Sequence, residues 1–264
     1  MGAEKTEPIY IITGASKGIG FETLKYLCTI PGYIITVSRT IPDELSKVLN
    51  ENQKKICHFL GNIDDPEIAD VIIDTVEKRG GKIDALIHNA ALAPVAQIKD
   101  IDVDIWKKLF DVNFFSIVDL TQKALPYLRK AKGRVIFVSS GSSVKPMVGW
   151  STYCTSKACV NMYAKVLSKE EPDIYTIAIR PGVVNTPMQE YVRNSCQNGF
   201  TKEDCEYVLG LEKNKKLRDP KEPASVLFNL AQLSKKVPED CNGEFVSIDD
   251  KRLASFKTFV TPTN

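Results

Sequence analysis

The sequence predicts a doubly wound α/β fold, with a central parallel sheet of about seven strands and helices on both faces. The first observation is alternation, because short apolar runs of strand length recur between longer segments with helical periodicity. The second is a glycine-rich turn, residues 13–20, that joins the first apolar run to the first helical segment. The third is size, since 264 residues with 43% hydrophobic content suffice for one substantial core. We therefore expect a single domain over residues 1–264.

The first half of the chain supplies four of the expected strands. They lie at 9–13, 33–38, 55–60 and 84–88. A helix follows the glycine turn, with apolar residues at Phe21, Leu24 and Leu27. Further helices are expected near 42–51 and near 65–79. Thr40 and Pro42 precede the former and Asp64-Asp-Pro-Glu begins the latter, and both are typical helix start signals.

The second half continues the alternation with longer helices. Helices are expected at 100–111, 113–131 and 150–170, and strands at 133–139, 174–179 and 244–248. One segment breaks the pattern, because residues 187–223 are polar, rich in charge and follow the sixth strand directly. Ligands of a doubly wound fold bind beyond the carboxyl ends of the strands. We therefore expect this insertion to cover the substrate.

The glycine-rich turn, Thr13-Gly-Ala-Ser-Lys-Gly-Ile-Gly20, is expected to cradle phosphate. Gly14 would allow the tight turn, Gly18 would let a pyrophosphate approach the backbone, and Gly20 would let the helix pack closely on the strand. The N-terminus of the adjoining helix attracts the anion. The position between a strand and a helix favours this interpretation over an ordinary loop with three glycines.

A second motif points to proton chemistry. Tyr153 and Lys157 lie four residues apart and so share one helix face, and Ser140 ends an apolar strand thirteen residues before Tyr153. A free phenol titrates near pH 10, and moving its pKa to about 7 takes roughly 4 kcal/mol of preferential stabilisation of the phenolate. We expect Lys157, helped by the positive charge of a bound cofactor, to supply it. Alone, such a pair also arises by chance on solvated helix faces.

The spacing Thr-Gly-x-x-x-Gly-x-Gly, together with Tyr-x-x-x-Lys, resembles the short-chain dehydrogenase/reductase family. Three further segments match motifs of this family in the same order. Residues 89–91 are similar to its Asn-Ala-Gly, Asn113 to its catalytic asparagine, and 180–186 to its Pro-Gly-x-x-x-Thr segment. The resemblance spans about residues 8–250 and implies a Rossmann fold. Ala91 departs from the family's glycine, which could narrow the space over the cofactor.

The resemblance implies roles for the matched residues. Tyr153 would protonate a carbonyl oxygen while Ser140 donates a stabilising hydrogen bond to it. Lys157 would hold the cofactor ribose and lower the pKa of the tyrosine. Asn113 would support a water chain that returns the proton from solvent through Lys157. Ser142 remains the alternative to Ser140, because several serines are close together in this segment.

The end of the second expected strand predicts NADP(H) rather than NAD(H). An NAD site usually places Asp or Glu there to hold the ribose 2′-hydroxyl, whereas this chain has Ser38, Arg39 and Thr40. An arginine fork and the nearby Lys17 suit a 2′-phosphate, and the acidic pair 43–44 is interpreted as the first turn of a helix. The expected cofactor contacts are Gly14, Ser16, Lys17, Gly18, Ile19, Gly20, Ser38, Arg39, Thr40, Asn62, Ile63, Asn89, Ala90, Tyr153, Lys157, Pro181, Gly182, Val184, Thr186 and Met188.

The substrate side is expected to be apolar and aromatic with one cation, which suits a bulky or aromatic ketone. Its expected walls are Ala93, Ser140, Val144, Lys145, Trp150, Tyr153, Met188 and Tyr191. The Tyr-Cys-x-Ser-Lys-Ala run and the ending after Gly243 are similar to the sepiapterin reductase and benzil reductase branch, fungal members included, which reduces vicinal dicarbonyls. In sepiapterin reductase a C-terminal acidic residue holds the pterin. Asp249 or Asp250 could do so here, although an acidic pair near a chain end is more often solvated.

These features predict an NADPH-dependent reductase of a ketone or vicinal diketone, because cellular NADP(H) pools are kept largely reduced. Two other classes stay open. One is an oxidising alcohol or steroid dehydrogenase of the same family, which ready use of NAD would favour. The other is a regulator that senses NADPH without turnover, against which the intact Ser140, Tyr153 and Lys157 set argues.

Composition limits partners and compartment. The net charge of +2 is spread along the chain without a basic block, so no nucleic-acid partner is expected. The seven cysteines are odd in number and lack Cys-x-x-Cys or metal spacing, which indicates reduced thiols, no metal and a cytoplasmic protein. No apolar stretch reaches membrane-spanning length.

Assembly is expected by resemblance alone. The family commonly pairs through the helices near 113–131 and 150–170. The residues expected on their outward faces are Leu120, Ala124, Met162 and Val166. A homodimer or a homotetramer follows, and the sequence does not choose between them.

Overall fold

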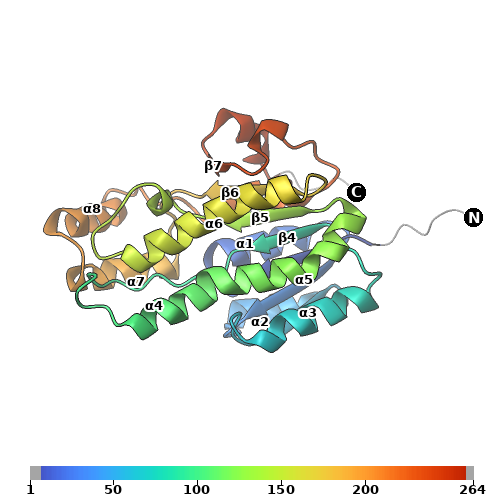
Figure 1. Cartoon of the computed structure of the whole chain (residues 1–264), viewed down its shortest axis with the longest axis horizontal. Coiled ribbons are helices and arrows are strands. Elements are labelled where there is room, and N and C mark those ends of the chain that lie inside the picture. Colours follow the sequence, from blue (N-terminus) through green and yellow to red (C-terminus); the bar gives the residue numbers. More distant parts are fainter. Residues whose placement is uncertain (1–6, 260–264) are drawn as a thin grey trace, which may run out of the picture.

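The computed structural model, which describes residues 7–259, is built on a parallel sheet of seven strands (Figure 1). The strands are β1 (Ile9–Thr13), β2 (Tyr33–Ser38), β3 (Ile56–Leu60), β4 (Ala85–His88), β5 (Arg134–Val138), β6 (Tyr175–Arg180) and β7 (Phe245–Ser247). Their order is β3-β2-β1-β4-β5-β6-β7, and each neighbouring pair is parallel. The predicted doubly wound fold is confirmed, and each expected strand end lies within about one residue of the observed end.

The strands are apolar because helices cover both faces of the sheet. On one face, isoleucines of β1 and β2 pack with α1 (Gly18–Leu27), α2 (Asp43–Glu51) and α9 (Lys221–Ala231). On the other face, residues such as Ile35 and Phe137 pack with α3 (Pro66–Lys78), α5 (Ser116–Ala131) and α6 (Ser151–Glu170). Figure 1 shows α3, α5 and α6 crossing the near side of the sheet.

Several helices begin at the start signals that the sequence carries. Asp65 accepts a hydrogen bond from the Glu67 N–H at the start of α3, and Asp102 accepts one from the Asp104 N–H at the start of α4 (Val103–Phe110). Between α4 and α5 the chain passes through a π-helical turn, Asp111–Phe115, which the sequence did not predict. Within residues 7–259, no helix combines the length and the apolar character needed to cross a membrane.

The prediction for the outward face of α5 is wrong. Leu120 and Ala124 are 1% and 0% exposed and belong to the core, because this i, i+4 stripe of α5 faces the sheet. The two residues predicted on α6 do face outward, with Met162 62% and Val166 44% exposed. Any outward apolar face of this region must therefore be built from other residues of α5 and its neighbours.

The expected insertion is a helical segment, which we call the flap and define as residues 187–217. It contains α7 (Pro187–Ser195), a short turn (Cys196–Asn198) and α8 (Lys202–Lys213), which lie at the left end of Figure 1. Its base is closed by a bridge between Val184 and Arg218, where the Asn185 N–H donates to the Arg218 carbonyl at 2.9 Å. The predicted end at residue 223 is too late, because α9 has already begun by then.

The structure also corrects the expectation that every cysteine is a reduced thiol. Cys196 and Cys205 form a disulfide inside the flap, with Cα atoms 5.3 Å apart. The fold of the flap brings them together across nine residues, and no short cysteine motif marks such a pair. The other five, Cys28, Cys57, Cys154, Cys159 and Cys241, are free.

Candidate active site

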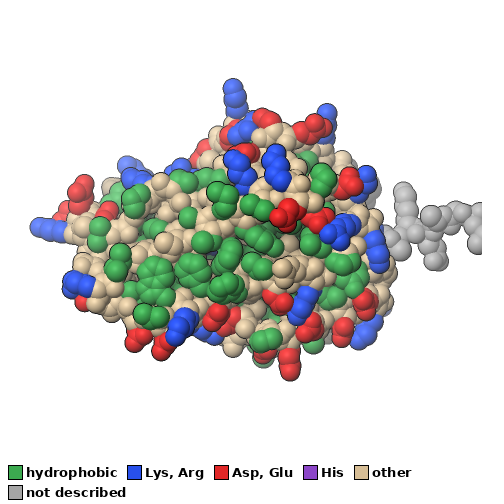
Figure 2. All heavy atoms as spheres, in the orientation of Figure 1, with side chains coloured by type: hydrophobic (Ala, Val, Ile, Leu, Met, Phe, Trp, Pro, Cys, Tyr) green, Lys and Arg blue, Asp and Glu red, His purple; other side chains and the backbone are tan. Residues whose placement is uncertain are grey.

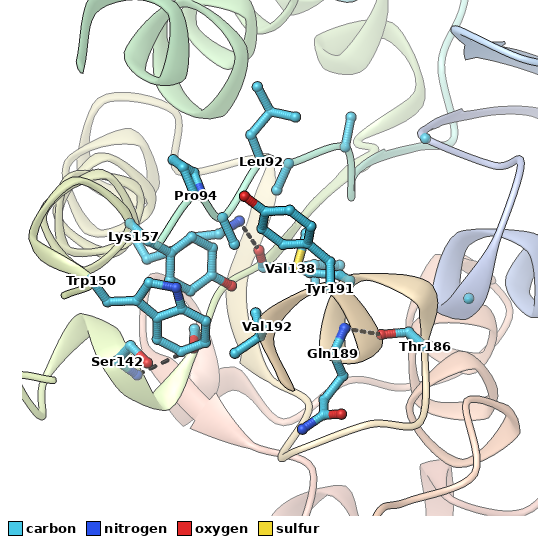
Figure 3. Close-up of a pocket in the computed structure, with 18 of the residues that line it drawn as sticks. Leu92, Pro94, Val138, Ser142, Trp150, Lys157, Thr186, Gln189, Tyr191 and Val192 are labelled. Carbon is cyan, nitrogen blue, oxygen red and sulfur yellow. Dashed lines mark hydrogen bonds between the residues drawn. The ribbon is translucent and has the colours of Figure 1, made fainter. Parts of the chain in front are cut away.

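A cavity of about 1270 Å³ lies at the carboxyl edge of the sheet, between the glycine turn and the flap. It is lined by the segments that follow β1, β4, β5 and β6, so it sits where the strand order reverses between β1 and β4. Figure 3 shows part of its wall. The structure places nearly all of the predicted site residues on this wall. The exceptions are Gly20, Thr40 and Asn113.

The side chain of Asn89 holds the glycine turn in place. Gly14 has φ +72°, and a Cβ there would lie 2.8 Å from the Cα of Ala90. The Asn89 side-chain amide donates to the carbonyls of Thr13 and Gly14, both at 3.0 Å. Gly20 packs against the same amide, where a Cβ would come within 2.4 Å. Gly20 is therefore packed between the turn and Asn89 and does not reach the cavity, whereas Asn89 also lines the cavity.

The other side of the turn contacts the base of the flap. Gly18 has φ +58°, and a Cβ there would lie 2.9 Å from Cγ2 of Thr186. Thr186 in turn caps α7 by accepting a hydrogen bond from the Gln189 N–H at 3.3 Å (Figure 3). Lys17, the residue before α1, also lines the cavity, so a cation and a helix N-terminus face the same space. This arrangement suits an anion.

Ser140, Tyr153 and Lys157 meet on the wall opposite the turn. The hydroxyl of Ser140 lies near the phenol of Tyr153 and lowers its pKa, and Ser140 Oγ accepts a hydrogen bond from the Ser142 N–H at 3.2 Å. Lys157 Nζ lies 5.8 Å from the centre of the Tyr153 ring and donates to the Val138 carbonyl at 2.7 Å (Figure 3). Both Ser140 and Ser142 line the cavity, and Ser140 is the serine that acts on the pKa of the phenol.

Burial dominates the electrostatics of this cluster. It raises the pKa of Tyr153 to about 12, which the nearby hydroxyl of Ser140 only partly opposes, and it lowers the pKa of Lys157 to about 8. Burial, together with the charge of Lys157, lowers the pKa of His88 on β4 to about 3, so this histidine is neutral. The expectation that Lys157 makes the phenol acidic therefore does not hold for the side chains by themselves. At neutral pH the chain presents a protonated tyrosine beside a lysine that exchanges protons readily.

Asn113 lies behind this cluster in the π-helical turn and is fully buried. Its amide oxygen accepts from the Leu92 N–H at 2.7 Å, and its amide nitrogen donates to the Leu92 carbonyl at 2.9 Å and to Ser156 Oγ at 3.2 Å. The side chain therefore links the loop after β4 to α6, one residue before Lys157. It holds the site together from outside the cavity.

At the far end of the cavity, Arg39 and Lys17 line the wall near the end of β2. Ser38 Oγ donates to the Thr40 carbonyl at 2.8 Å and contacts His58 Nε2 at 3.2 Å. This hydroxyl therefore orders the loop that carries Arg39, and Thr40 itself lies outside the cavity wall.

The substrate end lies between α6 and the flap. Figure 3 shows Trp150 on one side and Tyr191 and Val192 of α7 on the other. The sequence missed several flap residues of this wall: Gln189, Val192, Glu203, Asp204, Tyr207, Val208 and Leu211. The apolar spacing of Cys205, Val208 and Leu211 is the signal that could have predicted an amphipathic α8. The carboxylates of Glu203 and Asp204 on α8 therefore line the same cavity as Lys145, the one cation expected on the substrate side.

The C-terminal acidic pair does not take part. Asp249 forms ion pairs with Arg218 and Lys257, and Asp250 forms one with Arg252. Neither carboxylate lines the cavity, so the role of a pterin anchor suggested for them has no support in the geometry.

Comparison with known proteins identifies the family of the chain. The family model for short chain dehydrogenases matches residues 8–197. The chain is 45% identical over 193 residues to an uncharacterized oxidoreductase of Schizosaccharomyces pombe, covering 73% of this chain and 77% of that one. It is 36% identical over 261 residues to an (S)-benzoin-forming benzil reductase of Saccharomyces cerevisiae, covering 93% and 97% of the two chains.

A solved structure gives the same result for the fold. The crystal structure of a short chain dehydrogenase/reductase from Saccharomyces cerevisiae superposes with a TM-score of 0.90 at 34% identity, covering 95% of this chain and all of that one.

Proposed function

The chain belongs to the short-chain dehydrogenase/reductase family, and we propose that within it the protein is an NADPH-dependent carbonyl reductase of bulky ketones and vicinal diketones. The observation that carries this proposal is that Ser140, Tyr153 and Lys157 lie together on the wall of the cavity that the glycine turn also lines.

A dinucleotide cofactor fits the residues present. The left-handed glycines at 14 and 18 leave space that a side chain would fill, and the N-terminus of α1 opens onto that space. When bound, the nicotinamide supplies the hydride. Lys17 and the N-terminus of α1 would hold the pyrophosphate, and Lys157 would hold the ribose beside the nicotinamide. The segment Pro181–Thr186 lines the cavity and contacts the glycine turn through Thr186, so it would help to hold the nicotinamide.

Arg39 and Lys17 favour the 2′-phosphorylated form of the cofactor, NADP(H). Both cations line the cavity where the ribose of the adenosine half would lie, next to the end of β2. An acidic side chain at this position would hold a free 2′-hydroxyl, whereas a guanidinium and an ammonium hold a phosphate. The Ser38–Thr40 hydrogen bond keeps the loop in place for this contact.

Tyr153 donates the proton. As the carbonyl carbon of the substrate receives hydride, its oxygen gains negative charge and takes the phenolic proton, while Ser140 donates a hydrogen bond to it. The raised pKa keeps Tyr153 protonated at neutral pH, and the alkoxide that forms is more basic than the phenolate. A protonated phenol is the form that reduction requires, whereas oxidation would need the phenolate.

The proton on Tyr153 is then restored through Lys157. Its pKa of about 8 lets the ammonium release and regain a proton close to neutral pH. Asn113 positions this route, because it ties α6 next to Lys157 to the loop after β4.

The substrate end favours an aromatic or bulky partner. Trp150, Met147, Tyr191 and Val192 present apolar surface around Tyr153, and the flap covers it. The similarity to a benzil reductase over nearly the whole chain supports a vicinal diketone as a member of that class.

We further propose that the protein pairs through the face formed by α4, α5 and α6. Exposed apolar residues gather there, namely Ile105, Phe115, Met162 and Val166 at 44%, 55%, 62% and 44% exposure. Figure 2 shows hydrophobic side chains gathered over these helices. A self-complementary apolar face is typical of a twofold dimer. Light scattering on the purified protein tests this, and a monomer at micromolar concentration would refute it.

Absorbance at 340 nm tests the activity. NADPH and NADH are compared with benzil, 1-phenyl-1,2-propanedione, sepiapterin and a simple aliphatic ketone. We expect oxidation of NADPH with the aryl diketones, faster than that of NADH. NADPH binding without turnover of any carbonyl would instead support a sensing role, and reduction of NAD by alcohols would support the dehydrogenase alternative.

A further inference from the structure

A chain of three aromatic rings joins the flap to the proposed acid. The ring of Phe200 lies 5.4 Å from that of Trp150 at 80°, and the ring of Trp150 lies 4.9 Å from that of Tyr153 at 43°. Phe200 belongs to the flap tip, which we define as residues 196–205. The phenol of Tyr153 is therefore packed, through one intermediate ring, against a segment that comes more than forty residues later in the chain.

The flap tip is held in one shape. The Cys196–Cys205 disulfide closes it, and the Phe200 N–H donates to the Cys196 carbonyl at 2.9 Å. Both cysteines and Phe200 are buried, at 0%, 8% and 7% exposure, in a small apolar cluster with Val95, Val192 and Val208. This cluster is separate from the two cores of the sheet.

The tip also fits closely against the loops beneath it. A Cβ at Gly199 would lie 2.9 Å from the Cα of Ala96, and a Cβ at Gly149 would lie 2.6 Å from the backbone of Gly199. Backbone therefore meets backbone at this point, immediately before Trp150. This contact fixes the position of Phe200 relative to Trp150.

Trp150 is held there by packing alone. Its indole N–H is buried and has no hydrogen-bond partner among residues 7–259, although buried polar groups are nearly always paired. Trp150 also stands at the start of α6, where its carbonyl accepts the first helical hydrogen bond, from the Cys154 N–H at 2.8 Å. A ring in this position affects both the start of the helix and the side chain of Tyr153.

We propose that Phe200 and Trp150 are positioning residues, through which the docked flap tip sets the orientation of the Tyr153 ring, and that the Cys196–Cys205 disulfide holds Phe200 in place for this task. The inference rests on the proposed function, because it takes Tyr153 as the acid. When the flap tip packs on Trp150, it also fixes the orientation of the Tyr153 ring. Loosening the tip therefore lowers kcat without lowering the affinity for the cofactor.

Kinetics of four variants test the proposal. For Phe200→Ala and Trp150→Ala we expect kcat with an aryl diketone, normalised to sites that bind NADPH, to fall about ten- to a hundredfold, as misplacement of a reacting group predicts. The dissociation constant for NADPH should stay within about twofold. Trp150→Phe keeps a smaller aromatic ring and removes the unpartnered N–H, so it should retain more of the activity than Trp150→Ala. Leu209→Ala, on the exposed side of α8, is the matched control.

A merely structural role gives a different pattern. Normalisation to NADPH-binding sites removes the effect of unfolded protein, so a purely structural Trp150 or Phe200 would leave the normalised kcat unchanged and overturn the proposal. The wild-type protein offers a second route that needs no substitution. Reducing the disulfide with a phosphine should lower kcat as Phe200→Ala does, and the double variant Cys196→Ser/Cys205→Ser should show no response to the phosphine.

Fluorescence separates this inference from the proposed function. The chain has two tryptophans, so Trp106→Phe leaves Trp150 as the reporter. In that background, Phe200→Ala or Cys205→Ser should shift the emission to longer wavelength, because water reaches the indole when the tip lifts. An unchanged spectrum would overturn the inference even if the reductase activity is present. A shifted spectrum with no carbonyl turnover in the wild type would instead show a docked tip and refute the proposed function.

Discussion

Lys157 Nζ lies 5.8 Å from the centre of the Tyr153 ring and donates its hydrogen bond to the carbonyl of Val138, at 2.7 Å. The ammonium is thus hydrogen-bonded to β5, while the phenol lies near Ser140. The two groups share a helix face without a direct hydrogen bond between them. Their proposed cooperation is therefore a relay of protons and a shared hold on the cofactor, rather than an ion pair that acidifies the phenol.

Lys157→Met should make the protein more stable and inactive. Burial lowers the pKa of Lys157 to about 8, so at pH 7 the folded protein carries a buried charge that the unfolded chain solvates freely. Removing it should raise the free energy of unfolding at pH 7 by about 1–3 kcal/mol. Denaturant unfolding measures this, and a variant less stable than the wild type at pH 7 would contradict the assignment.

The same pKa predicts how stability depends on pH. Between about 8 and the usual value of 10.5, the unfolded chain binds more protons at Lys157 than the folded protein, so stability should rise with pH in that window. The raised pKa of Tyr153 acts with the opposite sign between 10 and about 12. The difference between wild type and Lys157→Met, measured from pH 8 to 10, isolates the lysine. A flat difference would mean that Lys157 titrates normally.

Arg39→Asp should reverse the cofactor preference. The change removes the guanidinium that holds the 2′-phosphate and supplies a carboxylate suited to a free 2′-hydroxyl. We expect kcat/KM for NADPH to fall by about a hundredfold or more, since the lost charge-assisted contact and the new repulsion each weaken binding. Lys17→Ala is the comparison, because it removes a cation without adding an anion. Unchanged NADPH preference in Arg39→Asp would place the phosphate elsewhere.

Gly18→Ala should weaken cofactor binding, and Thr186→Ser should partly relieve the effect. A Cβ at residue 18 would lie 2.9 Å from Cγ2 of Thr186, which serine lacks. The strain of φ +58° remains in the double variant and costs about 1 kcal/mol, so relief should be incomplete. Fluorescence titration with NADPH measures both effects. Equal affinities of the single and double variants would show that the Thr186 contact does not shape the cradle.

Asn113→Leu should cost both stability and turnover. Leucine has a similar size but removes the partners of the half-buried N–H and carbonyl of Leu92, at up to about 1–3 kcal/mol for each group. Thermal unfolding should move to lower temperature, and kcat should fall more than the affinity for NADPH. A fully active variant would show that the link between the β4 loop and α6 does not position Lys157.

Local patterns explain why much of this molecule could be predicted from its sequence. The strand β1, the glycine turn and the Tyr153–Lys157 pair are set by spacing within a few residues. Most strands are buried on both faces and apolar along their length, so predicting them does not require knowing which face is buried. The prediction for the outward face of α5 was wrong because Leu120 and Ala124 lie on the stripe of α5 that packs against the sheet. Which stripe of a helix meets the sheet depends on packing between distant segments.

The flap is the part of the molecule that could least be predicted from the sequence. Its sequence is polar, yet Cys196, Phe200 and Cys205 are buried together, since α7 folds back against α8 and over the loop before α6. No short motif marks the Phe200–Trp150 contact or the disulfide, because each joins segments through tertiary structure. The same applies to the high pKa of Tyr153, which results from burial by residues far away in the sequence.

The most direct test of the central claim is the rate of NADPH oxidation with an aryl diketone by Tyr153→Phe, measured beside NADPH affinity in the same preparation. The substitution removes the hydroxyl and keeps the ring that packs on Trp150. The account predicts loss of kcat by about a thousandfold or more, with the dissociation constant for NADPH nearly unchanged. Turnover close to that of the wild type would show that the proton comes from another group, and the proposed mechanism would be wrong.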